Sequence, residues 1–336
     1  MAEYILSVAV PSYNVEKYLD KCLTSFSDRR FCGKIDVMIV NDGSVDSTPQ
    51  IAEKYVAEYP DIFRLINKEN GGHGSAVNCG MENAKGKYFR IVDGDDWVDT
   101  ENTVKLLDVL EKTDADLVVD QKSEVDMTTG KETFCPLPGG VEFGKEYLFS
   151  DICDKNDICT YIMLHTLSVK TELLHKNNIR LLEKIFYVDI EFIIKATVEA
   201  ETVLFTDLAV YKYLVGNANQ SMNYKNLVKN YSHHEKVTKE IVRFGLERNP
   251  ENEHIRNYLD RRVVLLLNSH YNIPLIFDDD RKRGLSEAKE FRRYLKKAAP
   301  RYAAATKKRY AEARILHFFG IDGNRLAKLK GRKGQV

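Results

Sequence analysis

The chain has 336 residues, of which 43% are hydrophobic and 30% are charged, and its 50 basic residues balance its 50 acidic ones. This composition is ordinary for a soluble globular protein, and no apolar run reaches the ~20 residues of a membrane-spanning helix. The first residues lack a signal-peptide pattern and the six cysteines form no CxxC pair, so we expect a cytoplasmic protein without zinc or redox chemistry.

The first 120 residues alternate short apolar strands with amphipathic helices. The predicted strands are YILSVAVPSY from residue 4, KIDVMIVND from 34, IFRLIN from 62, KYFRIVDGD from 87 and ADLVV from 115. Near-continuous apolar strands between such helices predict an α/β fold, a parallel sheet covered on both faces. The carboxyl ends of its strands should lie along one edge, where the ligands of open α/β sheets bind.

The second strand ends in VNDGSVDST, which places Asp42 at the predicted ligand edge. A carboxylate there can accept hydrogen bonds from a nucleobase or ribose. Taken by itself, however, the motif favours a plain turn before a helix cap at Asp46 or Ser47. After the third strand, NKENGGHGSAVN offers backbone N–H groups at a helix start that can approach a diphosphate. We expect His73 in this loop to be an ordinary turn residue.

The fourth strand runs into three carboxylates within residues 93–96 of RIVDGDDWVD. Such carboxylates repel one another unless a cation lies among them, and oxygen ligands suit Mg²⁺ or Mn²⁺. Gly94 would give the loop freedom to turn two of them toward one point. The alternative is a polar turn that leads to a helix cap at Asp99 or Thr100.

Beyond residue 120 the pattern changes. Residues 121–150 are polar and predict a hairpin and a loop, and residues 158–215 should complete the sheet with a helix after Asp189 and two short strands in VLFTDLAVYKYLV. From about Tyr224 onward the pattern is helical. We therefore expect a catalytic domain over residues 1–222 and a helical extension over 223–336.

The order PSYN, NDGS, NGG and DGDDW, each at a successive strand end, resembles glycosyltransferase family 2, over about residues 4–215. The resemblance implies an inverting, bacterial-type enzyme of glycan assembly with the GT-A fold, which is Rossmann-like with a mostly parallel sheet. It also implies that Tyr13 stacks on the nucleobase, that Asp42 holds the uracil edge, and that Asp93 and Asp95 bind Mn²⁺ or Mg²⁺. The implied nucleotide-sugar ligands are Pro11, Tyr13, Asp42, Gly72, Asp93, Gly94 and Asp95.

The same resemblance implies that Asp189, in IFYVDIEF, is the base that deprotonates the acceptor. Val188 stands where relatives carry a glutamate, and Glu191 is the nearest substitute, although its helical spacing points it elsewhere. Asp189 could instead be a helix N-cap. Val215 and Gly216 replace the basic residue that many relatives carry after the tyrosines.

The C-terminal part is strongly basic, with 18 Lys and Arg against four Asp and Glu over residues 281–336. Such helices can pack on their own domain, form a homo-oligomer or lie on the anionic inner face of a membrane, and we favour packing or oligomerisation. No nucleic-acid module accompanies the charge, so we expect no nucleic acid partner.

The resemblance therefore implies metal-dependent transfer of a hexose from UDP-glucose, UDP-galactose or UDP-GlcNAc to a glycan hydroxyl on a surface protein, capsule or cell-wall polymer. The alternative is a non-catalytic relative that binds nucleotide or glycan and acts as a scaffold in a glycosyltransferase complex. Nucleotidyl transfer would require a basic phosphate loop near the first strand, and VPSYNVEKY does not supply one.

Overall fold

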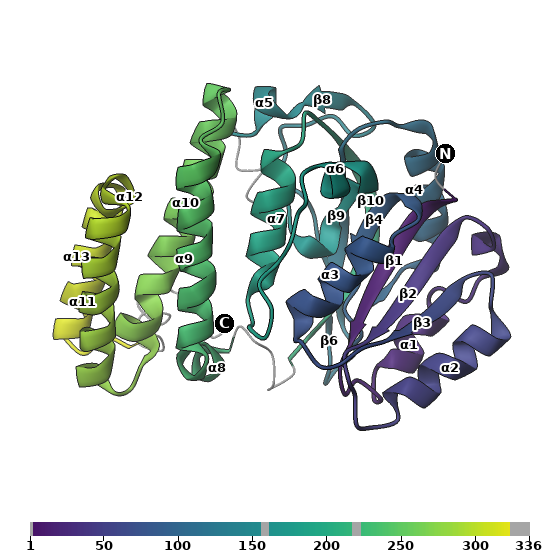
Figure 1. The fold of residues 1–336 in the computed structure, drawn as a ribbon, viewed down its shortest axis with the longest axis horizontal. Helices are drawn as coiled ribbons and strands as arrows, with labels where there is room; N and C mark the ends of the chain where they lie inside the picture. Colours follow the sequence, from purple (N-terminus) through teal and green to yellow (C-terminus); the bar gives the residue numbers. More distant parts are fainter. Residues whose placement is uncertain (1–2, 156–160, 217–222, 323–336) are drawn as a thin grey trace. The chain divides into compact units, whose positions relative to one another are not determined.

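A computed structural model describes residues 3–155, 161–216 and 223–322 (Figure 1). The chain divides into two compact units, Met1–Asn217 and Ala218–Val336, and each is described by itself. The predicted boundary after residue 222 falls next to a segment outside the described residues.

The first unit is built on one mixed sheet in the order β3-β2-β1-β4-β9-β6-β10-β5, with β7 beside β6 and β8 beside β10. Strands β1 to β4 run parallel, and β9 lies antiparallel between β4 and β6. The strands are β1 Tyr4–Ser12, β2 Ile35–Asn41, β3 Phe63–Asn67, β4 Gly86–Ile91, β5 Trp97–Val98, β6 Leu117–Asp126, β7 Glu132–Cys135, β8 Glu146–Leu148, β9 Leu167–Lys170 and β10 Thr202–Val215. Beyond β9, β6 and β10 form a further parallel pair. The predicted α/β class is therefore confirmed.

Helices cover both faces of this sheet because successive residues of a strand point to opposite sides. On one face, Leu6, Val8 and Val10 of β1 share a core with buried residues of α1, α2 and α4. On the other face α3 packs so closely on β1 that a Cβ added to Gly80 would lie 2.5 Å from the Cβ of Ala9. The helices are α1 Leu19–Thr24, α2 Thr48–Glu58, α3 His73–Asn83, α4 Thr100–Lys112, α5 Phe149–Ile152, α6 Thr171–Lys176 and α7 Val188–Val198, with 3-10 turns η1 Arg29–Phe31 and η3 Leu164–Thr166.

Of two predictions about strands beyond residue 120, one is confirmed and one is wrong. β6 and β7 form the expected hairpin, paired antiparallel. The prediction of two short strands in 203–215 is wrong, because β10 is one continuous strand. Its pairing with β6 shifts register between Phe205 and Ala209 and again before Tyr211, so the polar residues that suggested a break bulge out without ending the strand.

The second unit is helical in the part described, as the sequence predicts. Its elements are α8 Tyr224–Lys229, α9 Tyr231–Arg248, α10 Glu253–Asn272, the π-helical turn η4 Ile273–Phe277, α11 Arg281–Ala298, α12 Pro300–Ala305 and α13 Lys307–Phe318. Buried Leu259, Leu267, Phe291 and Leu295 lie in its core. Among the described residues, no helix combines the length and apolar character needed to cross a bilayer.

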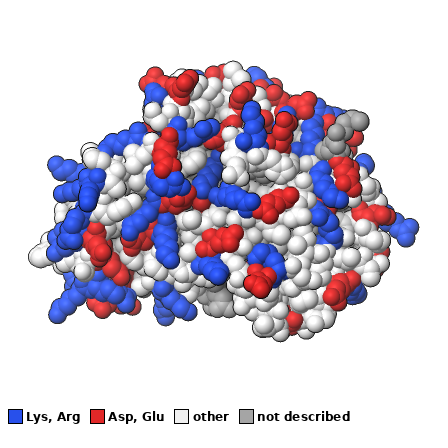
Figure 2. All heavy atoms as spheres, viewed as in Figure 1, with Lys and Arg blue, Asp and Glu red and all other residues white. Residues whose placement is uncertain are grey.

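The surface of the second unit carries the basic charge that the sequence concentrates at this end. Figure 2 shows Lys and Arg side chains gathered over the part of the surface formed by α11, α12 and α13. The end of α13 also exposes apolar side chains, since Phe318 is 77% and Phe319 68% accessible. Positive charge beside exposed aromatic rings is a combination suited to a negatively charged partner.

Candidate active site

The ends of β1, β2 and β4 are tied together at the edge where the sequence predicts ligands. The backbone N–H of Asp42 donates to the carbonyl of Ser12 at 2.9 Å, and that of Val92 donates to Ala9 at 2.9 Å. The NDGS and DGDD motifs therefore lie on either side of the β1 end. This is the convergence expected of parallel strands.

Asp42 organises the glycine loop that follows β3. Its Oδ1 accepts from Gly71 N at 2.9 Å and from Lys68 Nζ at 2.7 Å, and its Oδ2 accepts from Gly72 N at 2.7 Å. The residue is buried, with 2% of its surface accessible. Both carboxylate oxygens thus hold the NGG loop in place, a role that its position at a strand end did not reveal.

The glycine loop in turn supports the segment that leads into α7. Gly72 has a φ of +81°, and a Cβ there would lie 3.2 Å from the Cα and N of Lys184, whose N–H donates to Gly71 O at 2.6 Å. Asn78, from the same motif, exchanges two hydrogen bonds of 2.9 Å with the backbone of Leu181. The loop therefore brings the α7 lead-in beside the DGDD motif.

Gly94 serves the DGDD loop in a different way from the one predicted. Its φ lies outside the left-handed region, so the loop does not depend on glycine's conformational freedom. Instead a Cβ at this buried position would lie 3.1 Å from Pro11 O and from Val15 Cγ2. A side chain at position 94 would therefore crowd the end of β1, where the loop passes close to the strand.

Asp93 lies between two histidines. Its Oδ1 is 2.9 Å from His73 Nε2, and its Oδ2 is 3.8 Å from His165 Nε2. Burial opposes a charged His73, but Asp93 and Asp189 outweigh it and raise its pKa to about 9. Burial would raise the pKa of Asp93, yet its hydrogen bond with His73 lowers that pKa overall. His73 is thus a central charged residue of the site and not the plain turn residue expected.

Asp95 and Asp96 differ in how they are held. Asp96 is buried, and its carboxylate accepts from Tyr211 OH and from Leu214 N, both at 2.7 Å, which joins the loop to β10. Burial and the neighbouring carboxylates raise the pKa of Asp96 to about 8. Burial and Asp93 raise the pKa of Asp95 to about 6, and no other side chain of the described residues hydrogen-bonds its carboxylate. Asp95 is the carboxylate left free to bind a ligand.

Asp189 approaches this cluster from the first turn of α7. The helix follows Tyr187, whose φ of 71° is left-handed, and no side chain caps it, so Asp189 is not the N-cap. Its Oδ1 lies 3.8 Å from His73 Nδ1, and its side chain is 53% accessible. Although the side chain is half exposed, partial desolvation by the surrounding protein and the charge of Asp93 raise the pKa of this carboxyl, whereas His73 lowers it. The position suits a group that accepts a proton from an incoming molecule.

Glu191 takes no part in this arrangement. It is fully buried, with Oε1 2.7 Å from Lys195 Nζ and Oε2 accepting from Leu182 N at 3.1 Å. These contacts anchor the segment before α7. Val188, which stands where the resemblance predicts a glutamate, is also buried. Asp189 is therefore the carboxylate that α7 places beside His73.

His165 comes from η3, a segment that no sequence motif marks. Arg90, buried at 2% accessibility, forms a bidentate ion pair with fully buried Asp120 and donates to the carbonyl of His165 at 2.5 Å. The imidazole packs against Tyr211 and Tyr213, with ring centroids 4.8 and 4.7 Å away. Burial lowers the pKa of His165 to about 4, so the ring is neutral at physiological pH.

The remaining predicted ligands lie around this edge. Tyr13 is 51% accessible just after β1, which leaves its ring open for stacking, whereas Pro11 is buried inside the strand. Trp97 is half-buried, and Lys21 Nζ lies 3.2 Å from its ring centroid. The Lys21 side chain of α1 therefore packs over the Trp97 ring.

The residues present fit a divalent cation. One ligand atom each from Asp93, Asp96 and His165 lies within 4.8 Å of the others, and Asp95 follows on the same loop. Burial and, after it, the charge of the neighbouring carboxylates raise the pKa of both Asp95 and Asp96. A hard cation would offset that charge through oxygen ligands. The fit supports the sequence prediction of a divalent ion at this loop.

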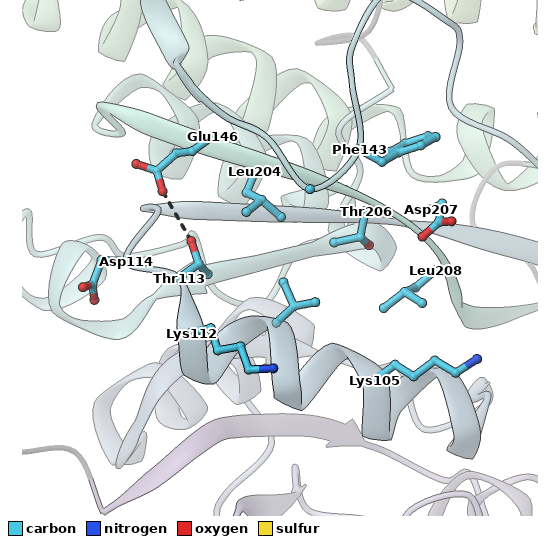
Figure 3. A pocket seen from close by; sticks show the side chains of 12 residues that line it. Lys105, Lys112, Thr113, Asp114, Phe143, Glu146, Leu204, Thr206, Asp207 and Leu208 are labelled. Atoms are coloured by element: carbon cyan, nitrogen blue, oxygen red, sulfur yellow. Dashed lines mark hydrogen bonds between the residues drawn. The ribbon is translucent and has the colours of Figure 1, made fainter.

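A separate pocket of about 650 Å³ lies beside α4 and β10 (Figure 3). Lys105 and Lys112 from α4 line one side, and Leu204 and Thr206 from β10 lie across from them. None of the predicted site residues lines this pocket, and it holds no constellation of carboxylates and histidines like that around Asp93.

Part of this chain is similar to known glycosyltransferases. Residues 7–161 match the family model described as Glycosyl transferase family 2. EpsH and EpsJ of Bacillus subtilis are each 38% identical over 102 and 114 residues, which span 30% and 34% of this chain but only 29% and 33% of those proteins. YibD of Escherichia coli, an uncharacterized glycosyltransferase, is 26% identical over 77% of this chain and 73% of its own length.

Among solved structures, residues 1–349 of TarS from S. aureus, in complex with UDP-GlcNAc, match with a TM-score of 0.68. The likeness covers 98% of this chain and 93% of that one at 19% identity. At this level of identity the likeness concerns the fold, and it confirms the predicted GT-A class.

Proposed function

Because this chain belongs to glycosyl transferase family 2, we propose that it is an inverting, metal-dependent glycosyltransferase that moves a hexose from a nucleotide sugar to a hydroxyl of a growing glycan. The observation that carries the proposal is the meeting of Asp93, Asp95 and Asp189 around His73, from segments nearly 100 residues apart. We expect the acceptor to be a glycan on a surface protein, a capsule or a cell-wall polymer.

The donor would lie across the carboxyl ends of β1, β2 and β4. Tyr13 offers an accessible ring for the nucleobase, and the Asp42-held loop at Gly72 offers a helix start for the diphosphate. The TarS fragment of the same fold was solved with UDP-GlcNAc, which supports a UDP-linked donor here. UDP-glucose, UDP-galactose and UDP-GlcNAc are the donors to test.

The chain's own residues would perform the reaction as follows. Asp189 accepts the proton of the acceptor hydroxyl as its oxygen bonds to the anomeric carbon, while the bond from that carbon to the UDP oxygen breaks. Attack from the face opposite UDP inverts the configuration. Mn²⁺ or Mg²⁺ held by Asp95 and Asp93 would offset the charge that develops on UDP. His73 holds Asp93 and lies beside Asp189, so it fixes the two carboxylates relative to each other.

A scaffold that binds nucleotide or glycan without catalysis is the alternative, and Val188 in place of an acidic residue is the observation in its favour. The accessible Asp189 carboxylate weighs against it, because a scaffold has no need of a base at that position.

The basic helices α11 to α13 would form a homo-oligomer or contact an anionic membrane from the cytoplasmic side. Sedimentation velocity and co-sedimentation with anionic vesicles separate these two.

Calorimetry of UDP binding tests the proposal, with and without Mn²⁺, on wild type, Asp95→Ala and the control Asp61→Asn, a change at an exposed carboxylate away from the site. We expect Mn²⁺-dependent binding that Asp95→Ala abolishes and Asp61→Asn retains, followed by Mn²⁺-dependent hydrolysis of one UDP-hexose. Equal binding without metal, or in Asp95→Ala, would contradict the metal-dependent mechanism. UDP binding without hydrolysis or transfer would favour the scaffold.

A further inference from the structure

The distance between the Asp93 carboxylate and the His165 imidazole is that of two ligands of one metal ion. Asp93 Oδ2 and His165 Nε2 are 3.8 Å apart, which is too long for a hydrogen bond. An ion bound at about 2.0 to 2.2 Å from each atom spans such a separation, since ligands at right angles are then about 3 Å apart and opposite ligands about 4 Å. The two atoms are thus spaced as ligands of one ion.

The imidazole is held so that only one nitrogen is available. Nδ1 is buried and has no hydrogen-bond partner among the described residues, whereas Nε2 faces the carboxylates. Arg90 fixes the backbone at His165, and the rings of Tyr211 and Tyr213 fix the plane of the imidazole. An imidazole whose ring plane is already fixed by packing loses little freedom when a metal binds.

His73 has a different relation to the same carboxylate. Its Nε2 is already at hydrogen-bond distance, 2.9 Å, from Asp93 Oδ1. That oxygen and that nitrogen satisfy each other, so His73 belongs outside the coordination shell. The two histidines on Asp93 therefore have separable roles, and one serves as a control for the other.

We propose that His165 Nε2 is a direct ligand of the divalent ion that Asp93 and Asp95 bind, which makes the centre a mixed imidazole and carboxylate site. The inference rests on the metal site of the proposed function. An imidazole ligand favours a transition ion over Mg²⁺, whose preferred ligands are oxygens. The chain should therefore bind Mn²⁺ in preference to Mg²⁺, and this preference should depend on His165.

Electron spin-echo envelope modulation of the Mn²⁺-loaded full chain, with and without UDP, tests the assignment directly. We expect a ¹⁴N modulation typical of a coordinated imidazole, which changes to a ¹⁵N pattern when only histidine is ¹⁵N-labelled. This measurement needs no substitution, so it does not depend on whether a variant folds. His165→Gln should remove the signal and weaken Mn²⁺ binding about tenfold or more, whereas His73→Gln should keep the signal.

The outcomes separate this inference from the proposed function. Bound Mn²⁺ without nitrogen modulation, or a signal that His165→Gln retains, would overturn the role of His165 while leaving a carboxylate metal site intact. A signal lost in His73→Gln and kept in His165→Gln would assign the nitrogen to His73 and overturn the inference. Failure of the wild type to bind Mn²⁺, even with UDP, would overturn both.

Discussion

The substitution Asp42→Asn tests whether the Asp42 carboxylate anchors the glycine loop or is free to bind the nucleotide. In the wild type, one carboxylate oxygen accepts from Gly71 N and Lys68 Nζ and the other accepts from Gly72 N. Asparagine has one acceptor oxygen, so its amide nitrogen would face one of the two backbone N–H groups. One of these hydrogen bonds would be lost and the other would lose its charge.

The expected cost follows from those contacts. A hydrogen bond to a charged group contributes roughly 1.5 to 3 kcal/mol, and a neutral one roughly 1 kcal/mol. Asp42 is 2% accessible, so solvent cannot replace the lost partner. One bond lost and one weakened give a decrease of about 3 kcal/mol in the free energy of unfolding of the first unit, before any smaller contribution from Lys68.

Urea denaturation followed by tryptophan fluorescence measures this value, because Trp97 is the only tryptophan of the chain and lies in the first unit. Asp61→Asn is the matched control, since it makes the same chemical change at an exposed position. Asp42→Asn with wild-type stability and weakened UDP binding would refute the anchoring role. Such a result would show that the carboxylate is reserved for the nucleotide.

Three further predictions concern the proposed base and its neighbours. Asp189→Asn should lower kcat for UDP release by about 10² to 10⁴, with little change in urea stability, because its carboxylate is accessible. Glu191→Gln should do the reverse, because it replaces the buried ion pair with Lys195 by a neutral contact. The free energy of unfolding should fall by about 2 kcal/mol or more, while turnover per folded molecule changes only severalfold. In EDTA, the raised pKa of His73 means that its protonated form stabilises the folded state fully below pH 6.5, and that this contribution is lost as the pH rises toward about 9. The difference in urea midpoint between wild type and His73→Gln should therefore shrink over that range, and a constant difference would contradict a charged His73.

Local patterns predicted the strand ends well because each motif there carries its own signal. Apolar runs ended by PSYN, NDGS and DGDD mark strands and their carboxyl ends, and parallel pairing brings them to one edge. The spacing in IFYVDIEF also predicted that Glu191 would point away from Asp189. These features follow from a few neighbouring residues.

What the sequence did not reveal depends on contacts between distant segments. His165 lies 72 positions after Asp93, in a short turn with no motif, and the antiparallel β9 that follows it brings it beside β4. The burial of Asp42 follows from the path of the NGG loop over it. The sequence around an aspartate at a strand end is the same whether its carboxylate accepts hydrogen bonds from a ligand or from the protein's own backbone.

The ion pair of Arg90 and Asp120 has an evolutionary consequence. Removing either partner leaves a buried charge and costs roughly 3 to 5 kcal/mol, whereas replacing both by apolar residues of similar volume can be nearly neutral. The two positions should therefore change together or not at all as lineages diverge. Arg90 also holds the backbone carbonyl of His165. If the imidazole is the metal ligand proposed above, lineages that exchange the pair for apolar residues would no longer hold it in place and should lose the histidine as well. A joint absence of all three across descendants would mark enzymes that have moved to a different metal centre.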